Sequence, residues 1–127
     1  MDIFEELLDN QRLYNTYMLD DAEVAKQKFR EAKAYSISGT RIDKKTTELI
    51  ILAIAITAKC EGCLARHAQY AIKAGATMDE IGTLIAICTH MTGSVSAFFG
   101  GKALRYAEMA LKELEEAKED KATCELC

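Results

Sequence analysis

Residues 48–72 decide the fold of this chain, and they read ELIILAIAITAKCEGCLARHAQYAI. Positions 49–58 are apolar apart from Thr57 and show no period-2 alternation. An apolar run without alternation is typical of a helix that is apolar around its whole circumference, and such a helix is buried on every side. We therefore expect this helix to be central in the fold, or to be covered on one face by another subunit.

The second half of the stretch predicts an amphipathic helix over about residues 60–74. One face is built at helical steps of three and one, from Cys60, Cys63, Leu64, His67, Ala68, Ala71 and Ile72. The opposite face suits solvent, with Glu61, Arg66, Gln69, Tyr70 and Lys73. Both thiols and the imidazole are therefore expected to point inward. Because His67 follows Cys63 by four residues, their side chains can touch along the helix.

The rest of the chain is also helical by its composition, since it has no proline and no sustained alternation. The other helices are expected at about 2–17, 21–37, 44–58, 78–91 and 94–119. Asp20 or Asp21 and Asp43 are candidate N-caps, and Thr77 with Glu80 forms a capping box. The expected fold class is all-α, with about six helices in a single domain over 1–127 and a mobile C-terminal tail at 120–127.

Length and charge exclude several classes of function. A chain of 127 residues is one domain by length and can bury a core without disulfides or metal. The net charge is −4 and no basic stripe is present, which argues against nucleic acid as a partner. The longest apolar run is half of the ~20 residues that span a bilayer, so no membrane partner is expected. The first residues do not resemble a signal peptide, and a cytoplasmic location is expected.

The chain has five cysteines, and four of them form two C-x-x-C pairs, Cys60 with Cys63 and Cys124 with Cys127. An odd count in a chain without a signal is unlike a secreted disulfide framework. In a reducing compartment such pairs are usually catalytic or metal-binding. The fifth cysteine, Cys88, follows an apolar stripe and is expected in the core.

Three features allow more than one interpretation. The pair Cys124–Cys127 can be read in three ways: as part of a frayed tail, as a mobile dithiol that reduces a Cys60–Cys63 disulfide, or, least favoured, as half of a four-thiolate zinc site. His90 faces the site or a subunit contact, or simply ends its helix. Small residues gather near the start of the last helix, where they either allow another backbone to approach or loosen the helix; they are Gly93, Ser94, Ser96, Ala97, Gly100 and Gly101.

Glu48 begins the apolar helix, and a carboxylate is costly to bury unless it is paired. It lies eleven residues before the turn, and His67 lies about seven residues after it. Two antiparallel helices with a rise of ~1.5 Å per residue bring these positions near one another. We therefore expect Glu48 to pair with His67. The alternative is an ordinary first-turn acid that favours the helix dipole.

These residue types together favour redox chemistry at a thiol. A thiolate is the nucleophile, and a histidine can accept the thiol proton while a helix N-terminus stabilises the anion. A carboxylate orients the imidazole and stabilises it when it is charged. A second cysteine three residues away captures the oxidised first one as a disulfide, which prevents irreversible over-oxidation. Cys63 is the favoured attacking thiol because it is nearer His67.

The spacing of Glu48, Cys60-Glu-Gly-Cys63 and His67, with the continuation over 68–81, resembles the signature of the alkyl hydroperoxidase D (AhpD) proteins. These belong to the carboxymuconolactone decarboxylase-like superfamily, and the similarity covers about residues 40–110. The resemblance implies an AhpD-like helical bundle that forms a homo-oligomer, often a trimer or hexamer. It also implies a thiol-dependent peroxidase or disulfide reductase that needs no metal or other cofactor, with a peroxide or disulfide substrate and a thiol electron donor.

By position, the resemblance makes Cys60 and Cys63 the redox pair and Glu48 and His67 the proton relay. Gly62 stands where the best-known member has a second histidine, which implies a shorter relay and weaker peroxidase activity. The decarboxylases of the superfamily lack the cysteine pair. The alternatives are a non-redox enzyme that uses Glu48 and His67 as acid and base on a lactone or small acid, and a metal-binding or structural protein.

Overall fold

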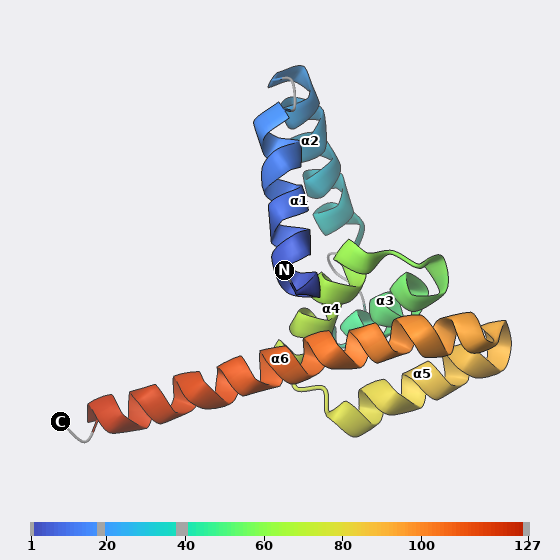
Figure 1. Cartoon of the computed structure of the whole chain (residues 1–127), viewed down its shortest axis with the longest axis vertical. Helices are drawn as coiled ribbons and strands as arrows, with labels where there is room; N and C mark the ends of the chain where they lie inside the picture. The colour runs from blue at the N-terminus through green and yellow to red at the C-terminus, as the bar shows by residue number, and fades with distance from the viewer. Residues whose placement is uncertain (1, 18–19, 38–40, 126–127) are drawn as a thin grey trace. The chain divides into compact units, whose positions relative to one another are not determined.

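A computed structural model describes residues 2–17, 20–37 and 41–125. These residues form six α-helices and no strand, so the predicted all-α class is confirmed. Figure 1 labels them in chain order: α1 (Ile3–Tyr17), α2 (Asp20–Ile37), α3 (Lys44–Ala58), α4 (Glu61–Lys73), α5 (Met78–Thr92) and α6 (Ser94–Glu125).

The chain divides into two compact units, residues 1–41 and residues 42–127. The first unit consists of α1 and α2, and the Lys26 ammonium of α2 lies 4.7 Å from the centre of the Tyr14 ring of α1. Its large apolar side chains are mostly exposed; they include Leu8, Leu13, Tyr17, Val24, Phe29 and Tyr35. The described side chains of the first unit therefore form little core, and the candidate site residues all lie in the second unit.

The second unit is a bundle in which α3 contacts α4, α5 and α6, while α6 packs along both α4 and α5 (Figure 1). Its fully buried large side chains come from three helices and are Leu52, Ile56, Leu64 and Ile81. Burying each such side chain stabilises the fold by about 1.5–3 kcal/mol. Helix α6 contributes Ala103 and Ala107, whose small side chains let it lie close to its neighbours.

The prediction that α3 is buried on every side is wrong for the single chain. Ile50 and Ile54 are 45% and 60% exposed, and they lie on one face because they are four residues apart. Further apolar side chains are exposed on α5 and α6, among them Ile87, Met91, Val95 and Phe98. A covering subunit, the other expectation for this helix, therefore stays a prediction.

Helix α3 begins as its sequence predicts. The Asp43 carboxylate accepts hydrogen bonds from the backbone N–H and the hydroxyl of Thr46. These bonds, the backbone one first, lower the pKa of Asp43 below its usual value. The capping box of Thr77 and Glu80 at the start of α5 is also confirmed. Both caps are local, so the sequence alone reveals them.

The last helix is longer than predicted, because α6 continues to Glu125 rather than ending near residue 119. The side chain of Cys124 and the whole of Cys127 lie outside the described residues, so their three interpretations remain predictions.

A tight turn connects α3 to α4. Lys59 adopts a left-handed conformation with φ of 58°, which costs a residue with a Cβ about 1–2 kcal/mol. The N–H of Cys60 then donates to the carbonyl of Ala55 at 3.1 Å, which closes the end of α3. Cys60 is also the N-cap of α4. The C-cap of α3, Lys59, is thus followed directly by the N-cap of α4, Cys60, and this fixes where α4 begins relative to α3.

Among the small residues near the start of α6, Gly100 permits a close helix–helix approach. A methyl group on Gly100 would overlap the side chain of Ile85 on α5, whereas nothing lies within 4 Å of the same position on Gly101. At Gly100 the neighbour that packs closely is thus the Ile85 side chain, whereas the interpretation of this cluster was the approach of another backbone.

We expect Gly100→Ala to lower the free energy of unfolding by about 1–3 kcal/mol, because over-packing forces Ile85 or the α6 backbone to move. Urea denaturation followed by circular dichroism measures the change. The matched control is Gly101→Ala, where the exposed methyl group leaves stability unchanged or raises it by up to about 1 kcal/mol through helix propensity. Equal stability of the two variants would contradict the close approach.

Candidate functional site

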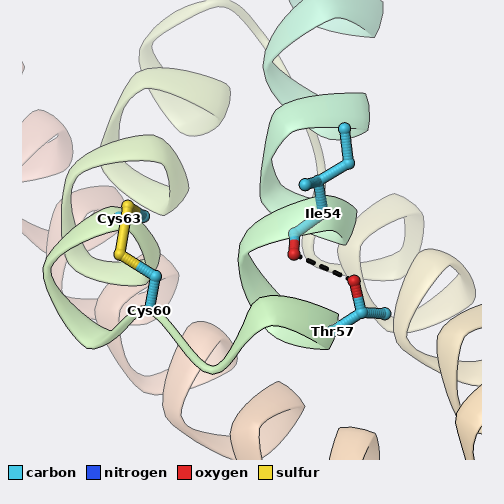
Figure 2. The surroundings of a disulfide bond; sticks show 4 residues. All are labelled: Ile54, Thr57, Cys60 and Cys63. Carbon is cyan, nitrogen blue, oxygen red and sulfur yellow. Dashed lines mark hydrogen bonds between the residues drawn. A yellow bond between two sulfur atoms is a disulfide. The ribbon is translucent and has the colours of Figure 1, made fainter.

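The two cysteines of the first C-x-x-C pair form a disulfide at the start of α4, with their Cα atoms 5.2 Å apart. Figure 2 shows the two side chains joined directly after the turn that follows Thr57. Cys60 is the N-cap residue and Cys63 lies in the first turn. Both residues are half-buried, so the pair is not enclosed by the core.

The start of α4 also supplies a favourable electrostatic environment for an anion. The first hydrogen bond of this turn runs from the N–H of Leu64 to the carbonyl of Cys60, at 2.9 Å. The N–H groups of residues 61–63 precede it and point toward the helix start, which carries the positive end of the helix dipole. A thiolate at either cysteine is stabilised there.

Glu48 and His67 form a buried pair between α3 and α4. Nδ1 of His67 lies 2.7 Å from Oε2 of Glu48, and the two side chains are 14% and 8% exposed. Because a carboxylate only accepts hydrogen bonds, Nδ1 of His67 is the nitrogen that donates to it. Nε2 is then the nitrogen that can accept a proton from another group. The structure therefore brings together the two residues that the helix lengths predict to meet.

A cavity of about 300 Å³ lies beside this pair and is lined by Lys44, Glu48, Tyr70, Lys73 and Ala74. The ring of Tyr70 also meets the His67 ring edge-on, with the ring centres 5.4 Å apart. The carboxylate of Glu48 thus contacts the imidazole, and Glu48 also lines the cavity.

The remaining chemistry-bearing residues of the second unit lie elsewhere. Cys88 is buried, its Sγ donates to the carbonyl of Ala53 at 3.7 Å, and burial raises the pKa of its thiol. It is a core residue, as predicted. His90 is exposed in the last turn of α5, where a basic side chain suits the helix dipole.

The contact between Glu61 and Lys102 is one that sequence reasoning missed. Glu61 was expected to face solvent, but its carboxylate forms an ion pair with the Lys102 ammonium of α6. That ammonium also lies over the rings of Phe98 and Phe99, 5.2 and 5.4 Å from their centres. No local pattern signals this contact, because 41 residues separate the two partners.

In the part of the chain that the structure describes, no three or more His, Cys, Asp and Glu side chains are grouped so that they could hold a metal ion. Within the same residues, no helix combines the length and apolarity needed to cross a membrane. The four-thiolate hypothesis is untested, because Cys127 lies outside these residues.

Comparison with known proteins identifies relatives of this chain. A family model described as the carboxymuconolactone decarboxylase family matches residues 24–113. An uncharacterised protein of Haemophilus influenzae is 42% identical over 45 residues, which are 35% of this chain and 40% of that protein. An uncharacterised protein of Cupriavidus necator is 34% identical over 59 residues, 46% of this chain and 52% of that protein. The matches thus span about half or less of these curated relatives.

Two solved structures share the fold. A carboxymuconolactone decarboxylase family protein from Legionella pneumophila, in its apo form, has a TM-score of 0.69 at 23% identity, over 84% of this chain and 92% of that one. A protein of the same family from Thermotoga maritima, described with a possible involvement in the antioxidative response, has a TM-score of 0.61 at 22% identity, over 94% and 96%. Identities this low indicate a common fold and leave the activity to be argued from the site.

Proposed function

Because this chain belongs to the carboxymuconolactone decarboxylase family, we propose that it is a redox member, an AhpD-like thiol-dependent peroxidase or disulfide reductase. The observation that carries the proposal is the Cys60–Cys63 disulfide at the start of α4, followed one turn later by His67 in its bond to Glu48. A cysteine pair, a proton acceptor and an orienting carboxylate are the parts that such chemistry needs.

The proposed cycle begins with both cysteines reduced. Nε2 of His67 takes the proton of the Cys63 thiol, and the thiolate attacks the outer oxygen of a hydroperoxide. The O–O bond breaks, the imidazolium returns its proton to the leaving alkoxide, and a sulfenic acid remains on Cys63. The Cys60 thiol then attacks that sulfur and releases water, which forms the disulfide. An external dithiol reduces the disulfide by exchange and is itself oxidised.

Each side chain has a defined part in this cycle. Glu48 holds Nδ1 of His67 protonated and stabilises the imidazolium after proton transfer. The helix start stabilises the thiolate. Gly62 adds no second proton acceptor between the cysteines, so His67 alone serves the pair and slow peroxide turnover is expected. The possible involvement of the Thermotoga maritima protein in the antioxidative response also supports a redox function.

The direct test oxidises the reduced protein with cumene hydroperoxide. A Cys124→Ser/Cys127→Ser background removes the second pair, so that only three thiols remain. We expect the Cys60 and Cys63 thiols to be lost with a mass decrease of two hydrogens, while Cys88 stays reduced because it is buried. A dithiol donor should then sustain turnover. A protein that keeps all three thiols in excess hydroperoxide, and that does not exchange with a disulfide substrate, would exclude both activities.

One observation favours a second candidate. Two lysines, Lys44 and Lys73, line the cavity beside Glu48, and their ammonium groups suit a small organic acid. In this alternative, Glu48 and His67 act as acid and base on that substrate and the cysteines have no part. A Cys60→Ser/Cys63→Ser double variant that retains full activity on such an acid would favour it over the redox function.

We also propose that the chain works as a homo-oligomer in a reducing, cytoplasmic setting that supplies its thiol donor. The exposed apolar side chains of α3, α5 and α6 support self-association, because burying apolar surface against another subunit is favourable. The trimer and the hexamer are the two assemblies expected.

A further inference from the structure

One of the two residues between the cysteines, Glu61, places a negative charge beside the redox pair. Glu61 is the first residue of α4, directly after Cys60 and two residues before Cys63, and its side chain is only 39% exposed. A carboxylate here suits the helix dipole. It also repels a thiolate on either neighbouring sulfur, and partial burial weakens the screening of that repulsion by solvent.

Lys102 of α6 brings an opposite charge to the same place. Its ammonium forms an ion pair with Glu61, and its side chain is 22% exposed. The rings of Phe98 and Phe99 lie beneath the ammonium and add a cation–π attraction. Two residues earlier, Gly100 leaves room for the Ile85 side chain, so that α6 lies close to α5. The cation is therefore held in position, unlike a surface lysine whose charge moves freely in solvent.

Other charged or ionisable residues lie beside the pair, including the exposed Arg66, three residues after Cys63. Glu48 of α3 is paired with His67 of α4, and Lys59, which precedes Cys60, is exposed to solvent screening. In the proposed cycle a thiolate at the start of α4 therefore meets the His67 imidazolium, the helix dipole and the Glu61–Lys102 pair.

From this arrangement we propose that Lys102 is a positioning residue that neutralises Glu61 and so sets the reduction potential of the Cys60–Cys63 pair. The inference rests on the proposed redox function and deepens it. The reduced pair carries a thiolate whereas the disulfide carries no charge, so a nearby cation stabilises the reduced form alone. Two electrons and the accompanying protons convert the disulfide to the dithiol, and Lys102 makes that conversion easier.

The test replaces Lys102 by methionine in the full chain, in the Cys124→Ser/Cys127→Ser background. The protein is equilibrated with reduced and oxidised glutathione, and alkylation with mass spectrometry gives the fraction of disulfide. We expect the equilibrium constant for reduction to fall about three- to tenfold in Lys102→Met, a shift of about 15–30 mV to more negative potential. The pH profile of alkylation of the reduced pair should move to higher pH.

Two variants separate charge from structure. Lys102→Met combined with Glu61→Gln removes both charges and should restore most of the wild-type potential, although the ion pair is still absent. Lys112→Met removes an exposed cation of the same helix and should change nothing. An unchanged potential in Lys102→Met would overturn the proposal, and so would a double variant that is shifted as far as the single one.

The outcome is also distinguishable from failure of the proposed function. A pair that equilibrates with glutathione and responds to Lys102 but ignores hydroperoxide removes the peroxidase activity and retains this inference. A pair that turns over hydroperoxide normally but whose potential is unchanged in Lys102→Met retains the peroxidase activity and removes this inference. A pair that never equilibrates with glutathione overturns both.

Discussion

Replacing either Cys60 or Cys63 by serine is expected to abolish peroxide-dependent turnover completely. A serine hydroxyl does not become an anion near neutral pH and cannot form the disulfide that the structure contains. The two variants should fail in different ways. Cys60→Ser keeps the attacking thiol, so it consumes one equivalent of hydroperoxide and accumulates a sulfenic acid on Cys63 that dimedone traps. Cys63→Ser should not react with hydroperoxide.

The control for these variants is Cys88→Ser, which changes a buried thiol that contacts Ala53 and not the pair. The folded fraction of Cys88→Ser should turn over hydroperoxide at the wild-type rate. Donor oxidation in a coupled assay measures all three variants. Undiminished turnover of Cys60→Ser or Cys63→Ser would contradict the proposed cycle, and dimedone labelling of Cys60 in Cys63→Ser would reverse the order of attack.

The second large effect is expected from Glu48→Gln, which should slow the oxidation of the reduced pair by about 100-fold. General acid–base catalysis contributes typically 10²–10⁴-fold, and the amide keeps the shape of the side chain while it removes the charge that stabilises the His67 imidazolium. Stopped-flow measurement of the reaction with hydroperoxide gives the rate. The glutathione equilibrium should change much less than the rate, since Glu48 acts on the proton transfer.

Glu108→Gln serves as the control, because it neutralises an exposed carboxylate on α6. Thermal unfolding checks that Glu48→Gln remains folded, since its partner His67 is 14% exposed and loses its hydrogen bond to a carboxylate. If Glu48→Gln reacts at the wild-type rate while His67→Gln reacts slowly, then His67 acts in proton transfer without Glu48, and the Glu48 carboxylate has only a structural role.

The sequence by itself determined the helices, the caps of α3 and α5, and the residues that make up the candidate site. Asp43, Thr77 and Glu80 act on backbone groups within three residues, so their effects are local and can be recognised in the sequence. The meeting of Glu48 with His67 was predictable for a related reason. A short turn joins their two helices, and the helix rise fixes which residues of such neighbours come together.

Only the tertiary structure decided how α6 lies against the site and how much of α3 is covered. The pairing of Lys102 with Glu61 depends on the path of α6, whose Lys102 follows Glu61 by 41 residues, and no periodicity encodes that path. The exposure of Ile54 likewise depends on which of its faces other helices occupy, because an apolar side chain has the same pattern in a core as at an interface. Local hydrogen bonds and helical periods are short-range, whereas packing partners are chosen by the shape of the whole bundle.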